Sequence, residues 1–465
     1  MSMRDRVVAA TAMAGALLAL GVGAASATAA VGDTSVFAKV AAPGYPAHAY
    51  VRPDGRVFEG TYVDPAGEGV PSKVFEYSST GAPLRSWTVP GQALRAEHGV
   101  QVATSDARGR LVLLDRTPAR ALLLDPETGA FTPYATFPDL KSCPAGDLLV
   151  GCELGSDEAP MANYATWLPD GRLLVTDYHQ DVIWQVPPGG GRASIWFQSE
   201  ELVSDGFGGA GIALTGDRRA VLLSQAGNVP SDLRGKLVKI PLLPDLDPGR
   251  PQTLWQSGLG DFPDGIAVAR SGNVYVALVG LAAQVAKVAP DGREITRFGT
   301  PLLGSNGSAI PFDGPSNARF LGTRILVANQ SPIFGNRANQ AILAIETGEE
   351  GVPELIPAGA GDPPRAAAPA PAPAPAARPR LRATASPSRI AVGRRTAVRV
   401  RVTAVVDGRR RAVRGARVRL LGRSATTSSS GRATLRVTAA RPGAYRLRAT
   451  RTGHRAGTAT VRARR

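Results

Sequence analysis

One short pattern recurs along most of the chain. Residues 262–276 read FPDGIAVARSGNVYV, which is an apolar run, a turn containing glycine and a second apolar run. Variants of this phrase give six copies in all, the others beginning near residues 45, 98, 161, 209 and 314. Each copy predicts three or four short strands joined by Gly, Asp or Pro turns. Because one such sheet cannot bury both of its faces, the copies must pack around a common axis, which predicts a six-bladed β-propeller.

A change of composition divides the chain of 465 residues. Residues 362–380 read DPPRAAAPAPAPAPAARPR and lack apolar periodicity, so they predict an extended, semi-rigid linker. The propeller is expected at residues 42–357 and a second domain at residues 381–465.

The second domain alternates Arg with Val, Leu or Ala, as in AVRVRVTAVV, ARVRLLG and YRLRAT. This period of two predicts antiparallel strands with one buried face and one wet face, hence a small β-sandwich and an all-β protein. The segment resembles bacterial immunoglobulin-like or carboxypeptidase-regulatory-like modules, a resemblance that implies a non-catalytic domain.

Charge is distributed unevenly between these parts. The formal net charge is +16, yet the residues from Arg378 onward hold 25 Arg and the single acid Asp407, a charge of +24 that leaves −8 on the remainder. Such a basic domain attracts polyanions, so an anionic polymer of the cell envelope or a lipid headgroup surface is an expected partner. Tyr445 is its only aromatic residue, which argues against specific nucleic-acid binding. The alternative is that the Arg content only reflects a genome of high GC content.

The first 30 residues have the features of a signal peptide. Arg4 and Arg6 precede an apolar run rich in Ala and Gly, and an Ala-x-Ala site suggests cleavage near Ala29 or Ala30. A membrane anchor is the alternative, but the run is short, and no later stretch is long and apolar enough to cross a bilayer. We expect a secreted protein, in which the closely spaced Cys143 and Cys152 form a disulfide.

The motifs PDGIAV-x3-GNVYVA, N-x7-GRLLVTD and PSNARFLGTRILVAN resemble the senescence marker protein, gluconolactonase and luciferin-regenerating enzyme family over residues 42–357. Strictosidine-synthase-like, streptogramin-lyase-like and NHL-repeat propellers share much of this pattern. The family resemblance implies a hydrolase of lactones and related esters. It also implies a calcium or zinc ion over the central channel, held by a Glu, an Asn and an Asp, because oxygen ligands suit a hard cation.

The resemblance assigns roles to a few residues. Asp264 matches the family's Asp, a metal ligand and general base, and Asn163 matches a polar position that lines the channel. Ala210 stands where the ligand Asn belongs, and Ala47 or His48 stands where the Glu belongs. Two of the three expected ligands are therefore missing, and a cation held by Asp264 and Asn163 alone would bind weakly. His48 is a candidate catalytic base in place of the Glu.

Three more residues are candidates for substrate binding at the channel mouth, namely His98, Asp205 and Asn317. Structural roles compete at each position. Asp264 can be a turn residue, Asn163 can bond a neighbouring blade, and His98 can be satisfied by a nearby carbonyl or carboxylate.

Three functions stay open at this point. The first is a lactone or ester hydrolase, and the second is a non-catalytic binding or scaffold propeller attached to the cell envelope through its basic domain. The third is a lyase of the streptogramin type, which would require seven blades and catalytic histidines late in the propeller, whereas no His occurs between His179 and His454.

Overall fold

The computed structural model describes most of the chain as β-strands joined by turns. Its described residues are 29–63, 69–143, 151–153, 158–199, 202–203, 208–227, 232–302, 304–331, 336–362, 379–406, 409–452 and 454–465. They divide into two compact units, residues 1–365 and residues 366–465. Residues 1–28 of the predicted signal peptide and most of the predicted linker lie outside the described residues. None of the helices described is long and apolar enough to cross a membrane.

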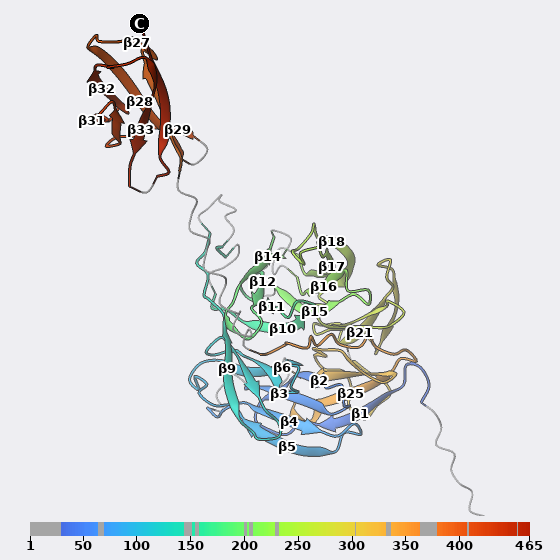
Figure 1. Cartoon of the computed structure of the whole chain (residues 1–465). Coiled ribbons are helices and arrows are strands. Elements are labelled where there is room, and N and C mark those ends of the chain that lie inside the picture. The colour runs from blue at the N-terminus through green and yellow to red at the C-terminus, as the bar shows by residue number, and fades with distance from the viewer. Residues whose placement is uncertain are drawn as a thin grey trace, which may run out of the picture. The chain divides into compact units, whose positions relative to one another are not determined.

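The first unit is a six-bladed β-propeller (Figure 1) in which each blade has four antiparallel strands, and pairing of β3 with β6 joins the sheets of blades 1 and 2. Blade 1 holds β2 (Tyr45–Val51), β3 (Val57–Val63), β4 (Lys73–Tyr77) and β5 (Pro83–Thr88), and blade 2 holds β6 (His98–Ser105), β7 (Leu111–Asp115), β8 (Arg120–Leu124) and β9 (Phe131–Thr136). Blade 3 holds β10 (Ala162–Trp167), β11 (Leu173–Asp177), β12 (Val182–Val186) and β14 (Ser194–Gln198), and the short β13 (Gly191–Arg192) pairs with β9. Blade 4 holds β15 (Gly209–Leu214), β16 (Ala220–Gln225), β17 (Arg234–Pro241) and β18 (Gln252–Leu259). Blade 5 holds β19 (Pro263–Val268), β20 (Val274–Leu278), β21 (Gln284–Val288) and β22 (Glu294–Phe298). The predicted all-β propeller is therefore confirmed. Its six blades disagree with the lyase hypothesis, which requires seven.

Blade 6 takes its strands from both ends of the propeller. Its inner strands are β23 (Arg319–Leu321), β24 (Arg324–Asn329) and β25 (Ala341–Glu346), and its outermost strand is β1 (Thr34–Lys39). β1 pairs antiparallel with β25, from Thr34 opposite Ile345 to Lys39 opposite Ala341. The propeller thus begins before residue 42, the boundary predicted from the repeats, because β1 is a lone strand without the repeated phrase around it.

Apolar side chains on both faces of each sheet explain why the blades form a ring. Six separate clusters of buried apolar residues lie between neighbouring blades, one for each junction. Trp167 and Trp184 fill the junction of blades 2 and 3, and both are fully buried. Since a sheet that is apolar on both faces needs a neighbour on each side, six such sheets are satisfied only by closing a circle.

The inner strands approach one another closely around the axis. Gly265 on β19 donates its backbone N–H to Ser316 O of blade 6 at 2.8 Å. A Cβ atom added at Gly265 would lie 2.5 Å from Asn317 Cα, closer than real Cβ atoms come to other atoms. Glycine is therefore required here by close approach of two backbones, and it fixes the position of the adjacent Asp264.

After β25 the chain crosses the face of the propeller on which the inner strands end. We call residues 350–362 the strap. Gly351 forms a β-bridge with Ala269 of blade 5, and Ala360 O accepts the backbone N–H of Ala107 in blade 2 at 3.2 Å. Because blades 5 and 2 lie opposite each other in a ring of six, the strap spans this end of the channel. It bounds a cavity of about 520 Å³.

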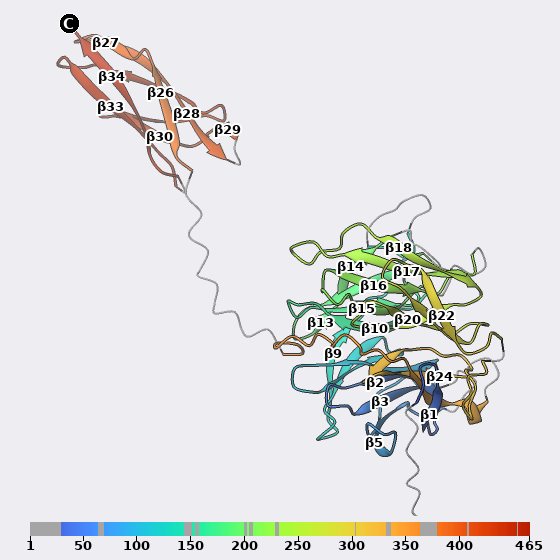
Figure 2. The ribbon, with the colours of Figure 1, turned by 90° about the vertical axis from the view of Figure 1, so that its right-hand side faces the viewer.

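The C-terminal unit is a β-sandwich of two sheets (Figure 2). One sheet contains β26 (Leu381–Ser386), β28 (Thr396–Val406), β29 (Arg409–Ala412) and β32 (Arg432–Val437). The other contains β27 (Arg389–Ala391), β34 (Gly457–Arg464), β33 (Gly443–Thr450), β30 (Arg417–Leu420) and β31 (Arg423–Thr426). One apolar core joins the inner faces of both sheets. The predicted alternation of buried apolar residues with exposed Arg is thus the pattern of a small sandwich.

Replacing Gly265 by Ala tests the close approach of blades 5 and 6. We expect G265A to lower the free energy of unfolding by about 1–3 kcal/mol, the usual cost of overpacking a well-filled site. Thermal unfolding of the full chain measures the effect. Gly359→Ala is the matched control, because a Cβ there has no atom within 4 Å. Equal unfolding midpoints for the two variants would contradict the packing described.

Candidate functional site in the central channel

The channel is lined by the first strands of the blades. β2, β6, β10, β15 and β19 each lie beside the next around the axis, and the segment leading into β23 completes the ring. Residues near the start of each inner strand therefore converge near one end of the channel. The buried polar side chains of this region come from blades that are far apart in the sequence.

Asp264 is the central acid of this region. Its side chain is 8% exposed, and its Oδ1 has no hydrogen-bond partner among the described residues. Burial raises the pKa of Asp264 to about 7, although hydrogen bonding with the Tyr164 hydroxyl opposes the rise. A carboxyl group with such a pKa exchanges protons readily near neutral pH.

The charge of Asp264 acts on three buried tyrosines, Tyr62, Tyr164 and Tyr178. Burial and then the charge of Asp264 raise the pKa values of Tyr164 and Tyr178 well above their usual range. The Tyr164 hydroxyl donates a hydrogen bond to Ser316 O at 2.6 Å. Burial also raises the pKa of Tyr62, whose hydroxyl has no partner among the described residues. The tyrosines are therefore neutral, and of the three only the Tyr62 hydroxyl is shown without a partner among the described residues.

His48 lies against the same tyrosine. Its ring centroid is 4.7 Å from that of Tyr164, and its Nε2 lies 3.5 Å from Arg319 Nε. Burial and then the charge of Arg319 lower the pKa of His48 well below its usual range. The imidazole is therefore neutral, and its Nδ1 has no hydrogen-bond partner in the part of the chain that the structure describes.

Arg319 connects this region to the strap. Its Nη2 donates to Ala103 O at 2.9 Å, and its Nη1 lies 3.9 Å from Glu354 Oε1. Burial raises the pKa of Glu354, while the charge of Arg319 opposes the rise. Arg319 and Glu354 both line the cavity beneath the strap.

A second buried acid, Glu59, supports the site from β3. Its Oε1 accepts the backbone N–H groups of Ala47 and His48, both at 2.8 Å. The pairing of β2 with β3 shifts register at this point, between Pro46 and His48. Burial raises the pKa of Glu59 to about 8, and the two N–H groups oppose the rise. Glu59 therefore holds the bulge that orients His48.

Asn163 is bonded within the ring of blades. Its Oδ1 accepts Gln101 Nε2 at 2.6 Å, and both side chains are buried. The oxygen that a metal would require is thus already in a hydrogen bond with the neighbouring blade. This is the structural alternative considered for Asn163.

The predicted substrate-binding residues lie in different surroundings. Both ring nitrogens of His98 contact backbone carbonyls, Ala96 O at 2.8 Å and Val70 O at 2.7 Å. Asn317 donates to Ala49 O at 2.9 Å and accepts from Ala328 N at 2.8 Å, which ties blade 6 to blade 1. These contacts are structural, and they leave neither side chain directed toward a ligand. Asp205 lies outside the described residues.

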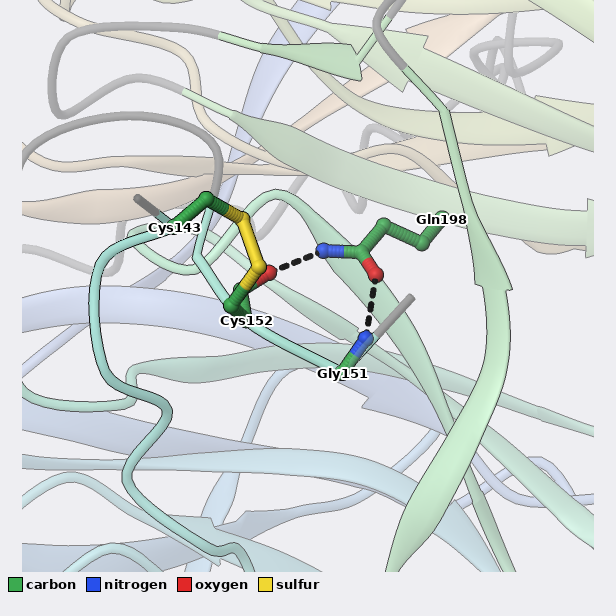
Figure 3. Close-up of a disulfide and its surroundings, with 4 residues drawn as sticks. All are labelled: Cys143, Gly151, Cys152 and Gln198. Atoms are coloured by element: carbon green, nitrogen blue, oxygen red, sulfur yellow. Dashed lines mark hydrogen bonds between the residues drawn. A yellow bond between two sulfur atoms is a disulfide. The ribbon is translucent and has the colours of Figure 1, made fainter. Parts of the chain in front are cut away.

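The disulfide between Cys143 and Cys152 is present and closes the short loop predicted for it (Figure 3). Gln198 of β14 holds this loop through its side chain, with Nε2 donating to Cys152 O and Oε1 accepting Gly151 N. The bridge therefore fixes a connection of blade 3 against its outer strand. It contributes no group to the channel.

The side chains around Asp264 do not suit a divalent cation. No group of three or more His, Cys, Asp or Glu side chains able to hold a metal exists among the described residues. Asp264 is a single carboxyl group, Asn163 Oδ1 is engaged by Gln101, and the side chains of Ala210 and Ala47 supply no donor. Calcium takes six to eight oxygen ligands, several of them from carboxylates.

Comparison with known proteins finds similar structures but no matching family model and no matching curated sequence. Regucalcin from Agrobacterium tumefaciens, described as a calcium-binding protein, is 14% identical over 70% of this chain and 98% of its own, with a TM-score of 0.47. Gluconolactonase from Xanthomonas campestris is 14% identical over 67% and 87%, with a TM-score of 0.42. Virginiamycin B lyase from Staphylococcus aureus is 14% identical over 67% and 95%, with a TM-score of 0.42.

The first two are senescence marker protein and gluconolactonase-like propellers, the class that the sequence motifs resemble. Similarity at this level concerns the fold. The strand pairing and the channel together define a six-bladed propeller with a buried acid on one of its inner strands.

The raised pKa of Asp264 predicts a specific dependence of stability on pH. The folded protein keeps this proton at pH values where the unfolded chain has lost it, so stability falls as pH rises through about 7. We expect D264N to raise the free energy of unfolding at pH 8.5 by about 2–4 kcal/mol and to leave it unchanged at pH 4. Thermal melts at both values measure this, with Asp291→Asn in an exposed turn as the control. An equal shift at both pH values would contradict the assignment.

The side chains around Asp264 also predict that added metal ions leave the melting temperature of the protein unchanged. A cation bound with a dissociation constant of about 0.1 mM would stabilise the fold by about 1.8 kcal/mol at 2 mM. We therefore expect calcium or zinc at that concentration to leave the melting temperature of EDTA-treated protein within error. Binding that is abolished in D264N would show that Asp264 is a metal ligand after all.

Proposed function

We propose that the propeller hydrolyses a lactone or ester beside Asp264. The single observation that carries this proposal is a buried carboxyl group with a pKa of about 7 and an oxygen that no described residue engages. A general base works best when its pKa lies near the working pH, and burial supplies that pKa here. The resemblance of the motifs around Asp264 to lactone hydrolases agrees with this substrate class.

The reaction follows from the side chains present. The Asp264 carboxylate takes a proton from water while the water oxygen attacks the carbonyl carbon and forms a C–O bond. The resulting oxyanion receives a hydrogen bond from the Tyr62 hydroxyl, the donor without a described partner. The ester C–O bond then breaks, the leaving oxygen takes the proton back from Asp264, and a hydroxy acid or an acid and alcohol result. His48 is neutral, accepts from Arg319 Nε and packs against the Tyr164 ring.

We also propose that the protein is exported. The charge and apolar pattern of the first 30 residues supports this, together with a disulfide, which persists in oxidising compartments.

A scaffold propeller without catalysis is the second candidate. It is favoured by Ala47 and Ala210 at two positions where the resembled family places metal ligands. The two candidates differ in what Asp264 does, since a scaffold would bind its partner without exchanging a proton.

Turnover of a panel of γ- and δ-lactones and aryl esters tests the hydrolase. We expect D264N to lower kcat/KM by about 100-fold or more, and Y62F by about 10-fold to 100-fold, because the variants remove the base and a hydrogen-bond donor. Wild-type kcat/KM should rise with pH around 7, while Asp291→Asn keeps the wild-type rate.

Two results decide between the candidates. Unchanged turnover in D264N would overturn the assignment of the base. Absence of turnover on every lactone and ester, by wild-type protein whose melting curve shows it folded, would favour the scaffold.

A further inference from the structure

The C-terminal sandwich presents arginines from the outer surfaces of both sheets. Along β33 and β34 the buried Leu447 and Val461 alternate with exposed arginines. We define the first arginine face, on the five-stranded sheet, as Arg389, Arg417, Arg419, Arg446, Arg448, Arg462 and Arg464. The second arginine face, on the sheet of β28, is Arg382, Arg399, Arg401, Arg432 and Arg436.

No acid balances these charges in the part of the unit that the structure describes. Residues 379–406, 409–452 and 454–465 contain no Asp or Glu, and they form no ion pair. Arginines even stand directly opposite each other, Arg419 against Arg448 and Arg401 against Arg432. Like charges in such cross-strand pairs destabilise a sheet. An anionic ligand that lies between them would remove this cost.

Hydroxyl groups alternate with the arginines on the same faces. Arg446 pairs with Thr460, and Arg448 pairs with Thr458. On the second face Arg399 stands between Ser386 and Thr434. Directly opposite residues have Cβ atoms about 4.5–5.5 Å apart, so a guanidinium and a hydroxyl can donate to one anion.

The chemistry of these pairs favours phosphate over carboxylate. A guanidinium binds two oxygens of either anion in its own plane. A tetrahedral phosphodiester has further oxygens outside that plane, which the neighbouring hydroxyl can reach. Exclusive use of Arg, with no Lys from residue 378 onward, agrees with bidentate recognition.

The placement of the faces favours a flexible chain. Alternate residues on a strand are about 7 Å apart, which gives each face a regular row of sites. The two faces point in opposite directions, so a flat membrane can meet only one of them. Tyr445 is the only aromatic residue of the unit, and its hydroxyl donates to Arg441 O at 2.8 Å. Nucleic acid would lack the stacking surface it normally uses.

We propose that the two arginine faces bind a linear polyol-phosphate polymer, with each phosphodiester held by a guanidinium and a cross-strand hydroxyl. This binding function is independent of hydrolysis in the propeller. It gives the basic unit a partner of defined chemistry, a phosphodiester chain of the cell envelope.

Binding of labelled poly(glycerol phosphate) to the full chain in 150 mM salt tests the proposal. The first variant replaces Arg417, Arg419, Arg446 and Arg448 by Gln. The matched control replaces Arg394, Arg395, Arg441 and Arg451, which are exposed residues of turns, by Gln. We expect the first variant to lose affinity about 10-fold or more and to reduce the salt slope by about 3, against about threefold or less for the control.

A second variant tests the hydroxyl groups at constant net charge. T458V/T460V keeps the shape of the sheet and should weaken binding about threefold to 10-fold. Equal losses in the two arginine variants, or no loss in T458V/T460V, would reduce the binding to unspecific charge attraction and overturn the proposed sites. Tighter binding to poly-L-glutamate, oligo-dT or phosphatidylglycerol vesicles would overturn the choice of polymer. D264N should bind like wild type, which separates this result from the fate of the hydrolase proposal.

Discussion

Closure of the ring by β1 is the pairing on which the rest of the propeller depends. β1 adds the outermost strand of blade 6 and brings Phe37 and Ala38 into the apolar cluster between blades 6 and 1, beside Leu326 and Ile342. Without that cluster two faces would be left open, since every other junction is already filled. The channel and the convergence of the inner strands exist only because the circle is complete. The burial of Asp264 therefore rests on backbone pairing made far from it along the chain.

The centre of this ring contains buried acidic side chains, and their burial lowers the free energy of unfolding. Asp264 and Glu59 are buried acids, and burial raises the pKa of each, to about 7 and about 8. A buried charge without a partner lowers the free energy of unfolding, so both acids are neutral at pH values below their raised pKa. At higher pH they ionise and the folded protein loses stability. Glu59 offsets part of this loss of stability, because its Oε1 accepts two backbone N–H groups at a bulge. Asp264 Oδ1 and Glu59 Oε2 both lack a partner among the described residues. Unlike Glu59, Asp264 has no backbone N–H group among the causes that lower its pKa.

The repeated phrase was sufficient to predict the propeller and its six blades, and the alternation of Arg with apolar residues was sufficient to predict the sandwich. Both predictions succeed because alternation and turn residues indicate strands and buried faces directly. The disulfide was predictable from spacing and from an expected export signal. β1 was missed because a single strand carries no repeat. Glu59 was missed because its role depends on which strand lies beside it, although an acid inside the apolar strand VFEGTYV was a signal. Asp264 was found through its motif, but its pKa and its tyrosine neighbours follow from the fold alone.

The strap has a mechanical consequence for a protein held by its C-terminal unit. Its last residues are fastened to blade 2, where Arg108 pairs with Asp362 at 2.8 Å and Arg110 Nη2 donates to Gly361 O at 3.0 Å. Tension applied beyond residue 362 must first break these contacts and then peel the strap from blade 5 before it reaches β25. The pairing of β1 with β25 is thus protected from this force, and the ring of blades remains closed until the strap has detached.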